Sequence, residues 1–394
     1  MDSLEARSSK ALSDYRAGRF ADAIQAQIGI LNEVLGDNER WIAAAKHLCL
    51  YFFGAGDYHS CVPVFRRLLE LEPNDIEGLE NLGVIYKRIG EHRAAIHFLR
   101  RALEHAPDRP NIHDALAHAF SAIGESEKAV FHGGESLRLK DSEALKTGRP
   151  YPLNGAPKPF NGSDSGRNII SFSLWGNHPK YLHGAMRNAQ LAPDLYPGWT
   201  CRFYCDDSVP GKFRDKLKAL GAEVVLKPAR TNFYDGLLWR FEVISDPGVD
   251  RFLIRDADSV INIRERVAVD EWLQSGRHFH LMRDYFSHTE LILAGMWGGV
   301  TGVLPTVEEL LRRFKTTSGP TSNFDQVFLR NMVWPTVKQS VLIHDRHFRC
   351  FDSKPFPELG TLPEYRHVGQ NESALWGREG FHTPTGEDLV ALTS

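Results

Sequence analysis

The sequence predicts a helical-repeat domain followed by an α/β domain, in which helices cover both faces of a mostly parallel sheet. The first observation is a repeat, because Gly56, Gly90 and Gly124 recur at a spacing of 34 residues. Periods of this size indicate stacked helix pairs. The second is the alternation of short apolar runs with amphipathic segments after residue 167, which is typical of parallel strands joined by helices.

The composition limits the class of protein. Of 394 residues, 42% are hydrophobic and 25% charged, as in globular proteins of about two domains. The 47 basic and 50 acidic residues give a net charge of -3, so charge does not favour nucleic acid as a partner. Five cysteines, an odd count without a Cys-x-x-Cys pair, indicate a reducing compartment. The chain lacks a signal-peptide core and a transmembrane run. We therefore expect a cytoplasmic protein that could reach an inner membrane only through partners.

Residues 1–145 are predicted to form the repeat domain. Around Gly90, small and large apolar residues occupy fixed places: Leu79, Leu82, Gly83, Tyr86, Ala95, Leu99, Ala102 and Pro107. This pattern resembles the tetratricopeptide repeat, in which small residues let two antiparallel helices approach closely. We expect three to four repeats that bind a protein partner or mediate self-association. The alternative is that they only stabilise the neighbouring α/β domain.

Residues 146–166 are dense in proline, glycine, serine and asparagine and have no helical or strand period. This composition predicts a linker between the two domains.

Residues 167–394 are predicted to form the α/β domain. Strands are expected at 168–174, 200–204, 222–226, 252–254, 278–282 and 341–343. Helices are expected at 181–192, 213–220, 263–273, 307–314 and 325–331, and one more is indicated by Leu237, Leu238, Phe241 and Ile244. The glycine-rich segment 294–299 is predicted to be a turn.

One predicted strand ends in a pair of carboxylates, Asp256 and Asp258. Side chains two residues apart on an extended chain point the same way, so both carboxylates can face one ion. Open α/β sheets bind ligands at the carboxyl ends of their strands, and hard oxygen ligands suit Mg²⁺ or Mn²⁺. The alternative is a solvated turn that only ends the strand.

This half of the chain resembles the GT-A-type glycosyltransferases of bacteria, a Rossmann-like fold whose Asp-x-Asp motif holds a metal ion and a sugar nucleotide. The resemblance rests on the run FYDGLLWRFEVI…VDRFLIRDADSVI and on three features nearer the C-terminus, a glycine-rich turn, Asp325-Gln326 and a late histidine. It implies a transferase that uses Mn²⁺ or Mg²⁺ and a nucleotide-sugar donor such as a UDP-sugar. The order of these features is similar to that of retaining transferases of the glycogenin type, which favours retention.

The resemblance also implies a metal site. Asp258 would ligate the metal directly, and Asp256 would contact the metal or the ribose of the donor. His344, at the end of the last strand, would be a third ligand, with Asp345 and His347 as alternatives. A histidine satisfied near the core is the structural alternative for His344.

Further residues would hold the donor and the acceptor. Arg240 would bind the diphosphate, since its planar donors suit phosphate oxygens, and Trp175 and Gly176 would lie against the base and ribose. Gly295 and Gly298 would let the backbone approach the donor sugar or the acceptor. Asp284 or Asp325 would lie near the acceptor hydroxyl, either as a base or as a binder of sugar hydroxyls. Each has a structural alternative: Arg240 could flank a helix, Trp175 could be core, and the glycines could form a simple turn.

The sequence thus predicts a metal-dependent glycosyltransferase with a glycan, lipid-linked or protein acceptor, and the resemblance points to bacterial surface polysaccharide or lipopolysaccharide assembly. The alternative is an interaction protein whose transferase-like half is inactive. A two-metal phosphohydrolase would need further ligands that the sequence does not supply at convincing spacings. Protein glycosylation does not follow from the repeats, because the repeat-bearing enzyme that attaches N-acetylglucosamine to proteins has a larger, two-lobed catalytic region without this motif.

Overall fold

The computed structural model describes residues 3–153, 155–230, 233–314, 323–358 and 367–376. The chain divides into two compact units, Met1–Leu139 and Lys140–Ser394. Within the described ranges, none of the helices combines the length and the apolar character needed to cross a membrane.

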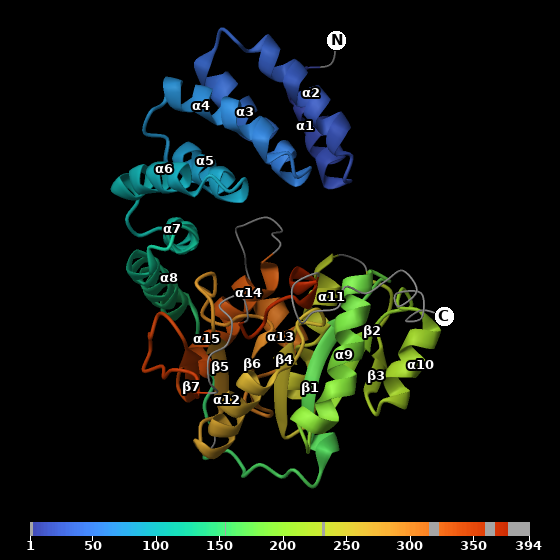
Figure 1. Ribbon diagram of the computed structural model, residues 1–394. Helices are drawn as coiled ribbons and strands as arrows, with labels where there is room; N and C mark the ends of the chain where they lie inside the picture. The colour runs from blue at the N-terminus through green and yellow to red at the C-terminus, as the bar shows by residue number, and fades with distance from the viewer. Residues whose placement is uncertain (1–2, 154, 231–232, 315–322, 359–366, 377–394) are drawn as a thin grey trace. The chain divides into compact units, whose positions relative to one another are not determined.

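The repeats are built from helix pairs (Figure 1). In order, the helices are α1 (Leu4–Arg16), α2 (Phe20–Glu33), α3 (Asn38–Gly54), α4 (Tyr58–Leu71), α5 (Ile76–Arg88), α6 (His92–His105), α7 (Pro110–Ala122) and α8 (Ser126–Thr147). Gly56, Gly90 and Gly124, at the turns inside three pairs, have φ of 77°, 85° and 79°, a left-handed conformation that glycine adopts without steric cost. α5 and α6 approach closely because Gly83 faces Leu99, whose Cγ would lie 2.5 Å from a Cβ on Gly83. The small residues therefore act as predicted.

The α/β unit is built on a mixed sheet with the strand order β3-β2-β1-β4-β6-β5-β7. The strands are β1 (Asn168–Leu174), β2 (Thr200–Cys205), β3 (Glu223–Leu226), β4 (Arg251–Arg255), β5 (Phe279–Arg283), β6 (Met296–Val300) and β7 (Val341–Asp345). Among these strands, β6 runs antiparallel to β4 and β5, whereas the other neighbours pair in parallel. The sheet is mostly parallel, as predicted.

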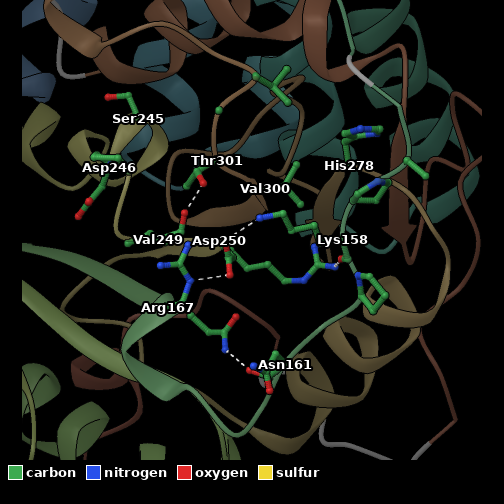
Figure 2. Close-up of a pocket in the computed structure, with 18 residues that line it drawn as sticks. Lys158, Asn161, Arg167, Ser245, Asp246, Val249, Asp250, His278, Val300 and Thr301 are labelled. Atoms are coloured by element: carbon green, nitrogen blue, oxygen red, sulfur yellow. Dashed lines mark hydrogen bonds and ion pairs between the residues drawn. The ribbon is translucent and has the colours of Figure 1, made fainter.

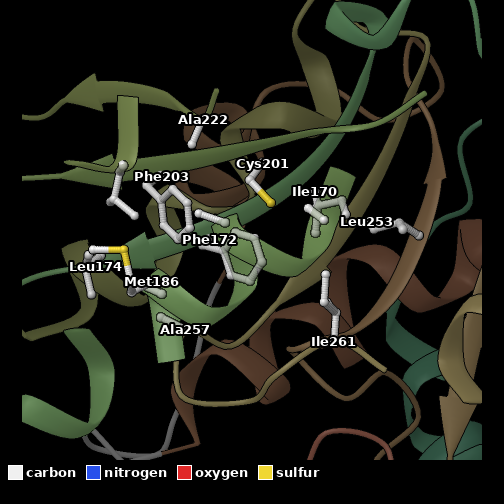
Figure 3. Packing of buried hydrophobic residues seen from close by; sticks show 14 of the residues in the cluster. Ile170, Phe172, Leu174, Met186, Cys201, Phe203, Ala222, Leu253, Ala257 and Ile261 are labelled. Carbon is white, nitrogen blue, oxygen red and sulfur yellow. The ribbon is translucent and has the colours of Figure 1, made fainter. Parts of the chain in front are cut away.

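Helices lie on both faces of this sheet. One face packs on α9 (Pro179–Leu195), α10 (Gly211–Ala219) and α12 (Ile263–Gln274). In this core Phe172 of β1 stacks on Phe203 of β2, with ring centroids 4.8 Å apart (Figure 3). The remaining helical segments are α11 (Phe233–Trp239), α13 (Val307–Arg313), α14 (Phe324–Phe328), α15 (Trp334–Val337), the 3-10 turns Ser165–Arg167, Glu242–Ser245 and Glu372–Leu375, and the π turn Leu329–Val333.

The segment predicted as a linker packs along the α/β unit. We call its described residues between 148 and 164 the strap. Phe160 stacks on Trp199, with ring centroids 5.7 Å apart, and Asn168 Nδ2 donates to Asn161 O at 2.9 Å. The strap lacks helix and strand in its described residues, but these contacts make it part of the domain surface rather than a free spacer.

The prediction of a turn holds for Ala294 and Gly295 but is wrong for the rest of 294–299, because Met296–Val300 forms β6 in the middle of the sheet. A Cβ on Gly298 would lie 2.6 Å from Phe252 O, and one on Gly299 would lie 2.5 Å from Phe279 Cδ1. The two glycines are there because large neighbours on β4 and β5 crowd this strand.

Candidate active site

The candidate site is a pocket at the carboxyl ends of β1 and β4. β1 has β2 on one side, to which it connects through α9, and β4 on the other, so the strand order reverses here. Open α/β sheets bind ligands at such a point. The pocket has a volume of about 480 Å³ and is lined by Ser173, Leu174, Trp175, Tyr181, Leu237, Arg240, Asp256, Ala257 and Asp258. This size suits a small ligand or cofactor, and four of the predicted site residues share the lining.

Arg240 joins two carboxylates at the wall of this pocket. Its Nη1 donates to Asp256 Oδ1, and its Nη2 donates to Asp325 Oδ2 at 3.0 Å. Arg240 is buried; burial acts to lower its pKa, but the charges of Asp256 and Asp325 outweigh this effect and the pKa of Arg240 is raised. The guanidinium therefore stays charged, in a fixed orientation, at the edge of the pocket.

Two serines of β1 fix the backbone of Arg240. Ser171 Oγ donates to Arg240 O at 2.7 Å, and Arg240 N donates to Ser173 Oγ at 2.9 Å. Ile170, Phe172 and Leu174 belong to the core on the other face of the sheet. Because successive side chains of a strand point to opposite faces, the alternation in β1 directs both serines to Arg240.

Asp258 is paired with Lys180, in the first turn of α9, with Nζ and Oδ2 2.9 Å apart. Burial, followed by the negative charge of Asp256, raises the pKa of Asp258. The Lys180 ammonium also lies 4.5 Å from the centroid of the Tyr181 ring. Burial and a neighbouring negative charge both disfavour the ionised form of this carboxylate. Any further cation that reaches it would stabilise the ionised form.

Trp175 and Gly176 follow β1 at the same edge of the sheet. The Arg230 guanidinium lies 5.3 Å from the centroid of the Trp175 ring, and Arg230 Nε donates to Asp206 Oδ2 at 3.1 Å. Gly176 N donates to Ser208 Oγ at 2.7 Å. The loop that carries the indole is therefore anchored to the loop that follows β2.

Gly295 and Gly298, predicted to serve the donor together, have different surroundings. A Cβ on Gly295 would lie 2.0 Å from Asp256 Oδ2, so Gly295 makes room for the carboxylate itself. Gly298 lies within β6 against Phe252 O, and the structure does not bring it to the pocket.

The structure does not bring His344 to Asp256 and Asp258. In the order β4-β6-β5-β7, its strand lies three strand spacings, roughly 14 Å, from β4. His344 is fully buried, with Nε2 3.0 Å from Glu271 Oε2 and Nδ1 2.8 Å from His280 Nε2. Its predicted role as a metal ligand therefore lacks geometric support.

Asp345 and His347, the two alternatives to His344, lie at the end of β7 and just after it. Asp345 is fully buried and accepts from the backbone N–H groups of His347 and Phe348. The His347 ring stacks on Phe286, with ring centroids 3.9 Å apart. Neither side chain is part of the pocket lining.

Asp284 and Asp325 differ in their relation to the pocket. Asp284 is fully buried at the end of β5, where it accepts from Arg264 Nη2 at 3.0 Å and from Val368 N at 2.9 Å. Asp325 is linked to the pocket through Arg240, and burial raises its pKa. Of the two, Asp325 is the carboxylate that the fold places beside the site.

Tyr181 and Leu237 line the pocket, and Lys180 pairs with the lining residue Asp258, but none of the three was predicted as a site residue. The available signal was Lys180 itself, a basic residue just after Pro179 at the start of the helix that follows β1. Such a helix begins at the same sheet edge as the carboxylates.

The carboxylate pair fits one kind of metal site. The side chains of Asp256 and Asp258 are 42% and 16% exposed, and both offer hard oxygens. Over the described ranges, however, no three His, Cys, Asp or Glu side chains come together as a metal-binding group. Mg²⁺ is commonly held by one or two carboxylates, with substrate phosphates and water as its other ligands. The pair suits such a substrate-completed site, not a cage made by protein alone.

The comparisons with known proteins concern mainly the repeats. The tetratricopeptide repeat family matches residues 52–119, so the chain carries these repeats at its N-terminus. A curated relative, BBSome complex member BBS4 from Bos taurus, is 31% identical over 100 residues, which are 25% of this chain and 19% of that protein. The chain thus spans about a fifth of the length of the curated relative that it matches.

Two solved structures illustrate the structural likeness. MamA from Desulfovibrio magneticus RS-1 is 20% identical, covers 37% of this chain and 80% of its own, and has a TM-score of 0.33. An O-GlcNAc transferase from Thermobaculum terrenum is 21% identical, covers 65% of this chain and 47% of its own, and has a TM-score of 0.39. Both scores lie below 0.5, so neither likeness bears on what this chain does.

Proposed function

We propose that the α/β domain is a metal-dependent glycosyltransferase that takes a sugar from a nucleoside-diphosphate donor. The observation that carries this proposal is the shared pocket at the reversal of strand order, where Asp256 and Asp258 share the lining with Trp175 and Arg240. A second cation, Lys180, pairs with Asp258. A nucleoside diphosphate needs these partners, namely a surface for the base, cations for the phosphates and carboxylates for a bridging metal.

The residues would divide the donor between them. Trp175 and Gly176 would lie against the base and ribose, and Arg240 would donate to the diphosphate. Asp256 and Asp258 would hold Mn²⁺ or Mg²⁺, which would neutralise charge that develops on the departing diphosphate. Without a ligand, Lys180 pairs with Asp258. Once Asp258 binds a metal ion, the Lys180 ammonium would be available to a phosphate oxygen.

The acceptor would enter beside the donor sugar. Asp325 would act as a positioning residue, since it holds Arg240 from the side opposite Asp256. Asp284 would hold the surrounding chain, because Arg264 and Val368 N already use its oxygens. We further propose that the acceptor is a glycan, a lipid-linked molecule or a protein, and that transfer retains the configuration of the sugar. The reaction would belong to the assembly of surface polysaccharide or lipopolysaccharide.

The repeats would select where the transferase works. The match to tetratricopeptide repeats supports a role in binding a protein partner or in self-association. Since the repeats carry their own core, with Leu79, Leu82 and Leu99 fully buried, this role does not depend on catalysis.

A second function is a scaffold whose α/β domain is inactive. One observation favours it: both carboxylates of the pair already have cationic partners, Arg240 and Lys180. In an inactive domain these ion pairs would be permanent and would serve stability alone.

Turnover of nucleotide sugars separates the two functions. The 394-residue chain is incubated with Mn²⁺, a panel of nucleotide sugars and a panel of glycan acceptors. Release of the nucleoside diphosphate is measured, as the sugar is transferred to an acceptor hydroxyl or to water. If the domain is a transferase, the nucleoside diphosphate is released. Chelation of Mn²⁺ then abolishes this release, and Asp258→Asn reduces it to background. Release that is unchanged in Asp258→Asn would remove this site from the reaction, and absence of release with every donor favours the scaffold.

A further inference from the structure

A second pocket opens at the amino ends of β1 and β4, whereas the candidate active site lies at their carboxyl ends (Figure 2). It has a volume of about 430 Å³ and lies between the strap, the starts of β1 and β4, and residues 300–303 at the end of β6. Its charged lining residues are Lys158, Arg167, Asp246, Asp250 and Arg251. Strand β4 separates it from the candidate active site, because Arg251 begins this strand and Asp256 follows its end. Five residues of strand span roughly 16 Å, so the pockets are separate sites.

The acidic residues of this second pocket already have partners. Arg167 donates to both oxygens of Asp250, each at 2.7 Å, and Figure 2 shows this pair. Arg202 Nη1 donates to Asp246 Oδ2 at 2.6 Å. The Lys158 ammonium is 4.0 Å from Asp250 Oδ1. Both carboxylates of this pocket are therefore already ion-paired with an arginine.

Arg251 is the cation without such a partner. It is only 5% exposed, and its Nη2 donates to the carbonyl oxygen of Lys158. Its guanidinium lies 5.5 Å from the centroid of the Trp272 ring. Among the residues that the structure describes, none forms an ion pair with Arg251. Burial lowers the pKa of Arg251, although the nearby charge of Asp250 opposes this. A buried charge without a counter-ion is costly, and an anion in the pocket would relieve that cost.

The strap closes this side of the pocket. Pro157 and Pro159 flank Lys158, and proline fixes φ, so little chain freedom is lost when a ligand binds. The Lys158 side chain is 84% exposed and its carbonyl is engaged by Arg251. The ammonium can therefore reach a ligand while its backbone stays in place.

We propose that this pocket binds a small molecule through one oxyanion group, a phosphate or a carboxylate, held by Arg251 with Lys158 at the rim. A single oxyanion group matches the single guanidinium in the lining of this pocket that lacks a carboxylate partner. The site is independent of the sugar-nucleotide pocket, so it stands whether or not the α/β domain is a transferase. It gives the domain a second ligand whose occupancy can differ from that of the donor.

Calorimetric titration of the full-length protein with inorganic phosphate, and separately with acetate, tests the site at constant ionic strength. We expect saturable binding of one anion per chain by at least one of the two, and the tighter one identifies the group. Lys158→Glu should weaken it by about tenfold, as for loss of a charge-assisted contact, and Arg251→Met should abolish it.

Two variants are controls. Arg138→Gln removes an exposed arginine of the repeats, paired with Glu135, and should not change the affinity. Lys218→Gln removes an exposed lysine, paired with Asp215, and should also leave the affinity unchanged. If Arg251→Met does not fold, the exposed Lys158 variant decides. The proposal is overturned if neither anion binds saturably or if Lys158→Glu binds as tightly as wild type. It is also overturned if Lys180→Met, which removes the partner of Asp258 at the candidate active site, abolishes binding.

Discussion

Gly295 and Asp256 are in such close contact that no larger side chain fits at position 295: a Cβ there would lie 2.0 Å from Asp256 Oδ2. On its other oxygen Asp256 accepts from Arg240 Nη1. The carboxylate is therefore fixed from two sides, by a backbone and by a guanidinium, before any ligand binds.

Gly295→Ala should displace Asp256. Because the methyl group meets backbone and carboxylate, we expect a loss of about 1–3 kcal/mol in the free energy of unfolding and a weaker response to Mn²⁺. Chemical denaturation with and without Mn²⁺ measures both. Gly166→Ala is the matched control, since its Cβ would have its nearest neighbour 3.9 Å away. Equal stability of the two variants would show that the contact at Gly295 relaxes freely.

Arg240→Met should destabilise the domain. It leaves Asp325, which is buried, without its guanidinium, and breaking a buried ion pair from one side costs about 3–5 kcal/mol. Arg240→Lys restores one contact at most, because an ammonium has no fork with which to join two carboxylates. We expect the order wild type, Lys variant, Met variant in urea denaturation.

Asp325→Asn completes that series. If Arg240 is held from both sides, the double variant Arg240→Met/Asp325→Asn should be more stable than Arg240→Met alone, because the unpaired buried charge is gone. Strict additivity of the two substitutions would mean that the residues do not act as a pair.

Much of the fold was readable from the sequence, and the reasons are local. Gly56, Gly90 and Gly124 mark turns that need φ above zero, and the buried strand Arg251–Arg255 is a continuous apolar run between charges. β6 was missed because its glycines indicate a turn, while the cause of their presence, Phe252 and Phe279 on neighbouring strands, is a contact between distant parts of the chain.

In the candidate site too, residues close in sequence were predicted, whereas contacts between distant parts of the chain were not. Asp256 and Asp258 are adjacent in sequence and could be found together. His344 was correctly placed at the end of the last strand, but the sheet order that sets this strand three positions from β4 cannot be deduced from the sequence. Lys180 joins Asp258 across 78 residues of chain, a relationship that only the folded sheet reveals.

Asp258→Asn should separate folding from metal binding. The pKa of Asp258 is raised above its ordinary value of 3.8, by burial first. The folded state therefore binds this proton more readily than the unfolded state. The stability that this group contributes is greatest below pH 3.8 and is lost as the pH rises through the raised pKa. Asparagine stays neutral, so the metal-free variant should be at least as stable as wild type at pH 7 in denaturation experiments.

The same pKa governs the response to metal. Stabilisation of wild type by Mn²⁺ should decline as the pH falls through the raised pKa of Asp258, since a ligand carboxylate must be deprotonated. Asp258→Asn should lack this stabilisation at every pH. Asp207→Asn is the control, because the Asp207 side chain is 92% exposed, and it should behave as wild type. A variant at position 258 that responds normally to Mn²⁺ would contradict the assignment.

Trp175→Ala should weaken nucleotide binding while the fold is retained. The indole lines the pocket, and stacking of a base on an aromatic side chain contributes about 1–3 kcal/mol, which is a fall in affinity of roughly tenfold or more. Trp175→Phe should recover part of the lost nucleotide affinity. Phe131→Ala in the repeats, where Phe131 is exposed, should leave the affinity unchanged.

The most direct measurement is calorimetric binding of nucleoside diphosphates, with and without Mn²⁺, to wild type, Asp258→Asn and Asp207→Asn. The proposed site requires one nucleoside diphosphate to bind at one per chain, only with Mn²⁺, in wild type and Asp207→Asn, and not in Asp258→Asn. Failure of every nucleoside diphosphate to bind with Mn²⁺, or equal binding by Asp258→Asn, would contradict a sugar-nucleotide pocket at the ends of β1 and β4.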